Sequence, residues 1–212
     1  MKWEEFLERA GNLPVIDTEL FFVGVKDPNS IKVQISRWQK QGKLTQIKRG
    51  LYVLAAPYKK QEVYEPYLAS IFKQPSYVSL EKAFEYHDLI PESVNVYTCV
   101  TTKRTGKFVT KLGIFDYKHI KTTLFWGYQA VTVNKQTAFM ALPEKALLDF
   151  FYLKSVKISF DYLGEMRLQN LKNIDLDRLL IFAKRFKKPG MLKVAKTIKE
   201  YVEQERAGEK EL

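Results

Sequence analysis

The stretch SIKVQISRWQKQGKLTQIKRGLYVL, residues 30–54, organises the N-terminal part of the chain. Within it Ile31, Ile35 and Trp38 recur at the spacing that places side chains on one face of an α-helix. The residues on the opposite face are mainly polar and basic. We therefore predict a helix whose apolar face packs on a core and whose basic face is exposed.

The ends of this helix are marked by capping residues. The turn Asp27-Pro28-Asn29-Ser30 supplies an N-cap, either Ser30 or Asn29, because their side-chain oxygens can accept hydrogen bonds from the first free N–H groups. Gly42 suits the left-handed position that follows the last turn of a helix. The predicted helix therefore runs from about Ser30 to just before Gly42.

A short hairpin is predicted directly after this helix. Leu44 and Ile47 precede the triplet Lys48-Arg49-Gly50, and Leu51 and Val53 follow it with the alternation of a strand. A glycine at such a turn, followed by Leu-Tyr-Val, indicates a hairpin with a basic tip. A helix with a basic outer face followed by a basic hairpin is the layout of a winged helix-turn-helix.

That layout suits DNA, because a helix fits the major groove and a hairpin beside it can reach phosphates. The segment from Pro28 to Gln61 contains basic residues and no Asp or Glu. We expect double-stranded operator DNA as the partner, bound by a monomer or a homodimer. The residues predicted to contact it are Ser30, Lys32, Ser36, Arg37, Lys40, Lys48 and Arg49. Two alternatives stay open: a protein-interaction module that never touches DNA, and a nucleic-acid enzyme with unrecognised acidic residues.

Composition limits the class of protein. The chain has 212 residues, 46% of them hydrophobic, and a formal net charge of +11, which favours a polyanionic partner. A single cysteine, Cys99, excludes an intramolecular disulfide and suggests a reducing compartment. No apolar stretch is long enough to span a membrane, and the N-terminus has no signal-peptide core. We expect a cytoplasmic protein without membrane association.

The order of the elements predicts an α+β protein. We expect a winged helix-turn-helix domain over residues 1–57, and over residues 62–212 a mixed α/β domain with an antiparallel-rich sheet and C-terminal helices. In the first domain we predict a helix over 2–10, a short strand over 13–16 that pairs with the wing, and an apolar helix from Asp17 or Thr18 to about Val25. Leu20, Phe21 and Val23 of that helix are expected to pack across the helix that begins near Ser30, after a turn over 26–29.

The second domain is predicted to begin with two helices and continue with strands. The helices cover 62–73 and 80–87, the latter capped by Ser79, and flank an extended Tyr77-Val78. Lys103 to Lys107 are expected to form a basic hairpin turn, and Pro143 to begin a helix that ends near Lys154. The predicted strands are 94–102, 108–112, 115–120, 123–126, 130–133 and 138–142, and the last helices are 160–170, 176–186 and 191–205.

Several segments resemble AbiEi-type antitoxins and related bacterial transcriptional regulators. They are ISRWQKQGKL and IKRGLYVL in the first domain, then YVSLEKAFEYHDLIPE, VYTCVTTKR, LGIFDYKHI and ALPEKALLDFFYL in the second. The resemblance extends to about Lys154 and departs at Asp88, where a glycine is expected after the Tyr-His pair. It implies a repressor of its own operon that acts as antitoxin of a nucleotidyltransferase toxin encoded beside it, with direct contact to the toxin left open.

No catalytic, metal or cofactor site is expected. The chain has two histidines, His87 and His119, and one cysteine, too few for a zinc site, and it has no glycine-rich phosphate loop. On the helix that begins at Pro143, we interpret Glu144 as favouring the helix N-terminus and Lys145 and Asp149 as an i,i+4 pair.

A second basic surface is predicted late in the chain, at Lys184, Arg185, Lys187 and Lys188, with Lys193, Lys196 and Lys199 following at helical spacing. Three interpretations remain open for it: a solvated face, extra phosphate contacts, or docking of an acidic partner.

Overall fold

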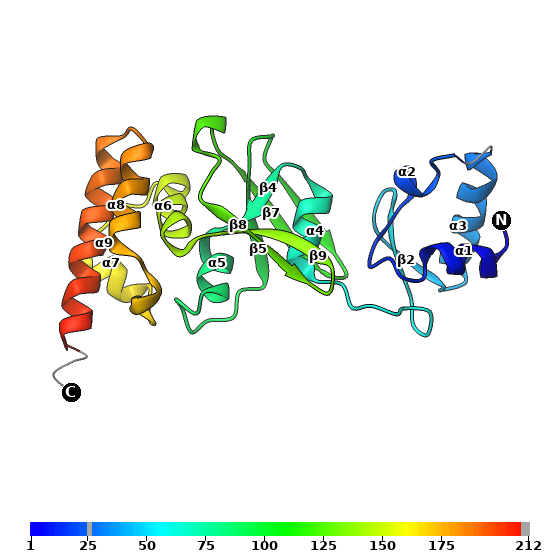
Figure 1. Cartoon of the computed structure of the whole chain (residues 1–212), viewed down its shortest axis with the longest axis horizontal. Helices are drawn as coiled ribbons and strands as arrows, with labels where there is room; N and C mark the ends of the chain where they lie inside the picture. The colour runs from blue at the N-terminus through cyan, green and yellow to red at the C-terminus, as the bar shows by residue number, and fades with distance from the viewer. Residues whose placement is uncertain (25–26, 209–212) are drawn as a thin grey trace. The chain divides into compact units, whose positions relative to one another are not determined.

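The computed structural model describes residues 1–24 and 27–208, and the chain divides into two compact units (Figure 1). The N-terminal unit comprises Met1–Glu65 with Thr110–Leu112, and the C-terminal unit comprises Pro66–Val109 with Gly113–Leu212. The class is α+β, with an antiparallel-rich sheet and C-terminal helices. In the described part of the chain, no helix is long and apolar enough to cross a membrane.

The N-terminal unit combines three helices with a small antiparallel sheet. Its strands lie in the order β1-β3-β2, so that the predicted strand before the second helix pairs with the second strand of the hairpin. The elements are α1 (Trp3–Ala10), β1 (Ile16–Asp17), α2 (Thr18–Phe21), α3 (Pro28–Lys40), β2 (Leu44–Lys48) and β3 (Leu51–Leu54).

The core of this unit is formed where α3 packs on α1 and the sheet. Ile31, Ile35 and Trp38 are buried, as the spacing predicts. The Trp38 ring lies 4.7 Å from that of Phe6 and 5.1 Å from that of Trp3, measured between centroids. Such aromatic clusters bury a large apolar area, so Trp38 anchors α3 to α1.

The second helix differs from the prediction. It ends at Phe21, whereas Val25 and Lys26, where we placed its end and the following turn, lie outside the described residues. Phe21 is buried, but Leu20 is 73% and Val23 74% exposed. The expectation that both pack against α3 is wrong, because one turn of helix directs only one side chain inward.

The C-terminal unit is built on a six-stranded sheet with the order β6-β7-β5-β4-β9-β8. Pairing is antiparallel for β4 with β5 and β8 with β9, and parallel for β5 with β7 and β4 with β9. The short strand β4, predicted only as an extended piece, is therefore central. The strands are β4 (Ser76–Val78), β5 (Val96–Thr101), β6 (Gly106–Thr110), β7 (Gly113–His119), β8 (Tyr128–Val133) and β9 (Gln136–Ala141).

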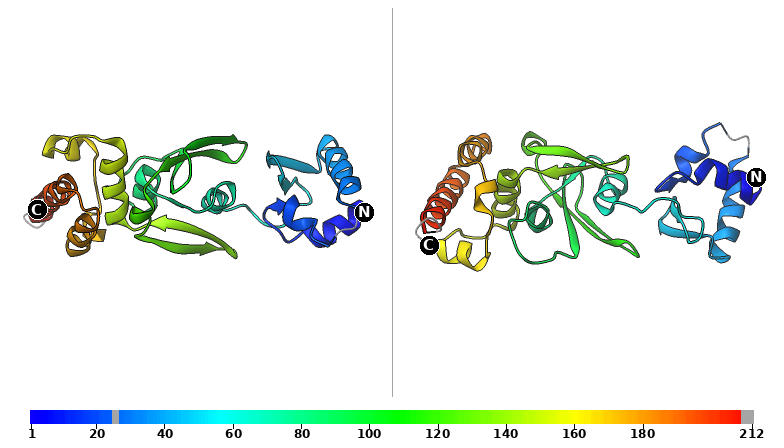
Figure 2. Two further views of the ribbon diagram at one scale, coloured as in Figure 1. Left: turned by 90° about the horizontal axis from the view of Figure 1, so that it is seen from above. Right: turned by 60° about the horizontal axis from the view of Figure 1, so that its bottom comes forward.

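Helices cover this sheet, and α6 (Pro143–Lys154) lies between the sheet and the C-terminal helices (Figures 1 and 2). It packs against α5, α8 and α9 as well as β9. Every residue from Pro143 to Phe151 is consequently buried. The other helices are α4 (Glu65–Phe72), α5 (Leu80–Tyr86), α7 (Phe160–Glu165), α8 (Leu176–Arg185) and α9 (Pro189–Gly208), with short 3₁₀ turns at Thr122–Leu124 and Leu171–Asn173.

Two predicted features of this unit are wrong, and the helix predicted over 160–170 ends already at Glu165. Residues 123–126 form no strand: Thr122–Leu124 is a 3₁₀ turn, and Trp126 packs on Phe182 and Phe186 instead. The basic segment 103–107 is no hairpin turn, because β5 and β6 are not neighbours in the sheet. Strand order depends on pairing between distant segments, which local patterns do not reveal.

The departure at Asp88 preserves the backbone that a glycine would favour. Asp88 has φ +56°, in the left-handed region, and follows the last turn of α5. Asp tolerates this region better than most residues with a side chain. The structure thus places a residue with a side chain at a backbone position that glycine commonly takes.

Candidate nucleic-acid interface

Helix α3 separates its apolar and basic residues onto opposite faces. With Ile31, Ile35 and Trp38 directed to the core, a rotation of about 100° per residue directs Val33, Ser36, Arg37 and Lys40 away from it. All four are exposed. The outer face of α3 thus offers a hydroxyl, a guanidinium and an ammonium group around one apolar side chain.

The start of α3 lies earlier than predicted, and this changes the role of Ser30. Asp27 is the N-cap, and its Oδ1 accepts hydrogen bonds from the backbone N–H groups of Asn29 and Ser30 at 3.1 and 3.3 Å. The Ser30 hydroxyl donates to the backbone oxygen of Asp27 at 3.1 Å. Ser30 therefore stabilises the turn, and the adjacent carboxylate makes this end of α3 the least favourable for a phosphate.

The hairpin β2–β3 places Lys48 and Arg49 at its tip, as predicted. Gly50 has φ +83°, the left-handed region that glycine adopts without strain. Its carbonyl oxygen accepts hydrogen bonds from the backbone N–H and the hydroxyl of Thr18, at 2.9 and 3.0 Å. These bonds fix the tip against the start of α2, so the exposed Arg49 projects from an anchored turn.

A hollow of about 760 Å³ joins α3 to the hairpin tip, and Lys32 and Arg49 both line it. Thr18, Phe22 and Tyr52 also contribute, and Glu19 places a carboxylate in the same hollow. Burial raises the pKa of the Tyr52 hydroxyl. Lys32 therefore belongs with the hairpin tip, whereas Arg37 and Lys40 belong to the outer face of α3.

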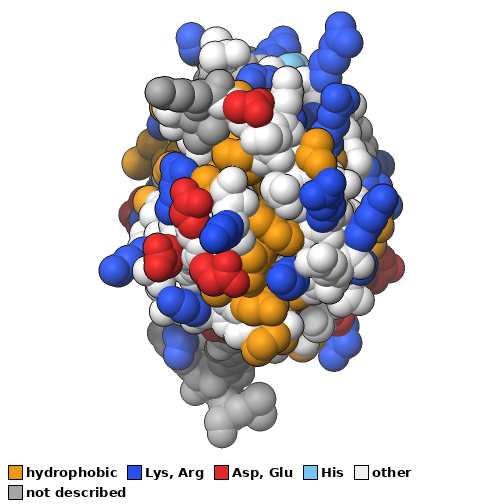
Figure 3. Space-filling model, turned by 90° about the vertical axis from the view of Figure 1, so that its right-hand side faces the viewer, with side chains coloured by type: hydrophobic (Ala, Val, Ile, Leu, Met, Phe, Trp, Pro, Cys, Tyr) orange, Lys and Arg blue, Asp and Glu red, His pale blue; other side chains and the backbone are white. Residues whose placement is uncertain are grey.

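Two further cations of the acid-free segment have structural partners. Lys43 Nζ lies 4.9 Å from the centroid of the Trp3 ring, and Lys59 pairs with Glu62. Figure 3, which looks onto the N-terminal unit, shows Lys and Arg side chains beside an exposed hydrophobic area, with carboxylates at lower left. The candidate interface is thus a basic part of a mixed surface.

Sequence reasoning missed Thr18 and Glu19, which belong to a different element. Thr18 anchors the hairpin tip, and Glu19 brings an acid that the run from Pro28 to Gln61 lacks. The predicted pairing of the early strand with the wing was the available signal, because it brings the residues after that strand to the hairpin.

A second polar group lies in the C-terminal unit, fully buried. Asp149 on α6 pairs with Lys145 one turn earlier, and both side chains are 0% exposed. Asp149 Oδ2 also accepts hydrogen bonds from the hydroxyls of Tyr77 and Ser79, at 2.8 and 2.9 Å. Lys145 Nζ donates to the Tyr77 hydroxyl at 2.9 Å. We call these four residues the α6 cluster.

Burial and pairing act against each other in the α6 cluster. Burial raises the pKa of Asp149 and lowers that of Lys145, and the attraction between the two charges opposes both shifts. Ser79 is the N-cap of α5 by position, but its hydroxyl goes to Asp149 instead of the helix. The predicted i,i+4 pair is present, as part of the core and not on the surface.

Glu144 also has a role that the sequence did not predict. Its side chain accepts hydrogen bonds from Nε and Nη2 of Arg178 at 2.8 and 3.0 Å, and from the backbone N–H of Asp175 at 2.7 Å. Glu144 is fully buried. It therefore joins α6 to the start of α8.

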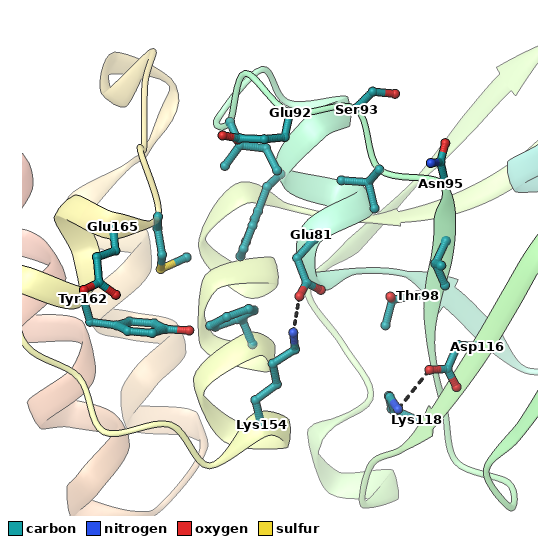
Figure 4. A pocket seen from close by; sticks show the side chains of 16 residues that line it. Glu81, Glu92, Ser93, Asn95, Thr98, Asp116, Lys118, Lys154, Tyr162 and Glu165 are labelled. Atoms are coloured by element: carbon teal, nitrogen blue, oxygen red, sulfur yellow. Dashed lines mark hydrogen bonds and ion pairs between the residues drawn. The ribbon is translucent and has the colours of Figure 1, made fainter.

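The C-terminal unit has a hollow of about 760 Å³ whose two lysines both pair with carboxylates (Figure 4). Within it Glu81 pairs with Lys154, and Lys118 pairs with Asp116 at 2.9 Å. Glu92, at its edge, pairs with Arg167. Glu165 adds a fourth carboxylate to the lining, so this hollow offers no uncompensated cation to an anionic ligand.

His87, His119 and Cys99 do not assemble into a site. His87 Nε2 lies 2.7 Å from the backbone oxygen of Ala141, and His119 Nδ1 lies 3.1 Å from that of Lys103. Burial lowers the pKa of His87. Among the described residues, no group of three or more His, Cys, Asp or Glu side chains could hold a metal ion.

The predicted second basic surface is only partly continuous. Arg185, Lys187 and Lys188 line a hollow at the turn between α8 and α9, whereas Lys184 does not. Lys193 lines the neighbouring hollow, and Lys199 pairs with Glu203 at 3.6 Å.

No protein-family model matches the chain, and a search of curated proteins finds no match.

Proposed function

We propose that the N-terminal unit is a winged helix-turn-helix domain that binds double-stranded DNA, and that the protein is a transcriptional repressor. The observation that carries the proposal is the division of α3 into a buried apolar face and an exposed face with Arg37 and Lys40, followed by a hairpin with Lys48 and Arg49 at its tip. In this proposal α3 is the recognition helix and β2–β3 is the wing.

The two groups of cations then have different tasks. Arg37 and Lys40 on the outer face of α3 would meet base edges in the major groove, where arginine commonly binds guanine. Arg49 and Lys32, beside the hollow at the hairpin tip, would bind phosphates and orient the domain. Glu19 in that hollow would repel phosphate from one side and so restrict how the backbone enters.

The antitoxin half of the proposal rests on the resemblance of the second domain. We propose that the C-terminal unit counteracts a nucleotidyltransferase toxin encoded next to this chain, and that the protein represses its own operon in the cytoplasm. The segments that carry this resemblance supply α5, β5, β7 and α6, the framework of the C-terminal unit. Direct binding to the toxin is a separate question.

The wing provides the test. Changing Lys48 and Arg49 to Ala should lower the slope of log binding constant against log salt by about 2, because each lost phosphate contact retains its condensed counterions. Binding to the DNA upstream of the chain's own gene and to random DNA of equal length should weaken alike. Gel-shift or fluorescence anisotropy titrations at several salt concentrations measure both.

The matched control removes the same two kinds of charge from the C-terminal unit, at the exposed Lys103 and Arg104. If that variant loses the same slope, the effect comes from net charge and not from the wing. The wing variant should also still rescue cells from the partner toxin. Loss of rescue in a folded, expressed wing variant would contradict the proposed division of tasks.

A second candidate function is protein docking through the N-terminal unit. The exposed apolar side chains of Leu20, Val23 and Val33 favour it, the last being 52% exposed in the middle of the outer face of α3. Exposed apolar patches mark interaction surfaces. Changing Val33 to Ser should leave DNA affinity within a few-fold if α3 docks protein, whereas a base-contacting Val33 would make the change costly on specific DNA alone.

A further inference from the structure

Two hollows of the C-terminal unit adjoin at the turn between α8 and α9. One has a volume of about 460 Å³ and the other about 520 Å³, and Tyr152 and Lys188 line both. We call the pair of hollows the α8–α9 groove. The basic residues that line the groove are Lys121, Lys157, Arg185, Lys187, Lys188 and Lys193.

The groove carries uncompensated positive charge. Neither hollow is lined by an Asp or Glu, and no carboxylate of the described residues forms an ion pair with any of the six cations. The hollow of Figure 4, in the same unit, pairs its lysines with carboxylates. The N-terminal end of the 20-residue helix α9 adds the positive end of its dipole at Pro189 and Gly190.

The backbone conformation at Lys187 is a second feature of the groove. Lys187 has φ +50°, the left-handed region, in the turn that ends α8. Glycine is the usual residue at such a position, because it adopts the left-handed region without strain. A lysine at this strained position lines the groove, where its charge adds to those of Arg185 and Lys188.

The lining also distinguishes between kinds of anion. The guanidinium of Arg185 lies 4.0 Å from the centroid of the Trp126 ring, and Lys188 Nζ lies 4.6 Å from that of Tyr152. Tyr152 lines both hollows, so Lys188 covers an aromatic face on which a base of a single-stranded nucleic acid would stack. The second hollow has an apolar floor that includes Ile158, Met191 and Val194, which suits an aliphatic side chain.

We propose that the α8–α9 groove binds an acidic segment of a partner protein, with carboxylates on its cations and an apolar side chain on the floor of the second hollow. The inference deepens the antitoxin half of the proposed function, since it gives that half a binding surface, and it is independent of DNA binding. Charge complementarity and the apolar floor together favour a peptide over a nucleic acid.

The test uses the full-length protein and a fluorescein-labelled peptide of alternating Glu and Leu. Anisotropy should detect binding that falls with salt and that the same peptide with Gln in place of Glu lacks. Changing Lys187 to Gly removes a charge and relieves the left-handed backbone, so stability should be kept or raised while affinity falls by up to about fivefold. The double change Lys187→Gly/Lys188→Ala should weaken binding by about tenfold.

Lys184 is the matched control, because it is an exposed lysine of α8 that does not line the groove. Lys184→Ala should change peptide affinity less than twofold. Equal effects of Lys184→Ala and Lys187→Gly, or equal binding of the Glu and Gln peptides, would overturn the proposal. Tighter, groove-dependent binding of labelled oligothymidylate would assign the groove to nucleic acid and overturn it as well.

These outcomes are separable from a failure of the proposed function. Groove variants should bind the chain's own upstream DNA like the wild type, because the N-terminal unit is unchanged. Wild-type protein that fails to bind that DNA but binds the acidic peptide would contradict the proposed repressor function and leave the groove proposal standing. Wild-type protein that rescues cells from the partner toxin but does not bind the peptide would overturn the groove proposal and leave the antitoxin half of the proposed function standing.

Discussion

Helices α3 and α6 begin in the same way and use their charges in opposite ways. Each has a proline in its first turn and carries apolar and basic residues. In α3 the basic residues are exposed, whereas in α6 the side chains of Lys145 and Asp149 are 0% exposed. The difference arises because α6 lies between a sheet and two helices, whereas α3 packs through one face.

The comparison teaches that a charged residue must be judged by what covers its helix. The exposed cations of α3 remain in contact with water, so folding involves no desolvation cost for them and they are accessible to a ligand. On α6 the charges required partners from elsewhere in the chain, which Tyr77, Ser79 and Arg178 supply. We therefore propose a binding role for the charges of α3 and a structural role for those of α6.

The largest expected effect on stability comes from removing Asp149, the hydrogen-bond acceptor of the α6 cluster. Asp149→Ala should cost about 3–5 kcal/mol in the free energy of unfolding, because it leaves the Lys145 charge buried and two hydroxyls without their acceptor. Chemical denaturation followed by circular dichroism measures this. On α3, Lys40→Ala should stay within about 0.5 kcal/mol of the wild type.

A double variant separates charge from packing at this position. Lys145→Met/Asp149→Leu removes both charges while filling similar volume, so it should recover part of the loss of Asp149→Ala. If Asp149→Ala unfolds like the wild type, the pair is not buried, and the contrast between the two helices disappears.

The next effect concerns the buried face of α3. Trp38→Ala should destabilise the N-terminal unit by about 3–5 kcal/mol, since it leaves a cavity beside Trp3 and Phe6. Hydrogen exchange read by mass spectrometry should show lost protection in α1 and α3 and unchanged protection in α6. A variant that keeps this protection but loses DNA would show that Trp38 faces the ligand and not the core.

Sequence patterns predicted the elements whose signals are local. The bounds of α6 follow from Pro143 and from the apolar run behind it, and the buried face of α3 follows from the spacing of Ile31, Ile35 and Trp38. The helix start at Pro28 was missed because Asp27 competes with Asn29 and Ser30 as a cap, and only the hydrogen bonds identify the residue that serves.

The unpredicted parts depend on contacts between distant segments. The burial of Lys145 and Asp149 depends on Tyr77 and Ser79, which lie on β4 and at the start of α5. The α8–α9 groove likewise gains Lys121 and Lys157 from loops remote from the basic run that drew attention in the sequence. Glu19 enters the candidate interface because β1 pairs with the hairpin.

The most direct test of the proposed binding role of the charges on α3 is the affinity of Arg37→Ala for two DNAs. On the DNA upstream of the chain's own gene the variant should lose about 1–3 kcal/mol of binding free energy, and on random DNA of equal length much less. Arg104→Ala, which removes the same charge from the C-terminal unit, should bind both like the wild type. Equal losses on the two DNAs would limit Arg37 to a phosphate contact, and an unchanged affinity on both would contradict the assignment of α3 to DNA.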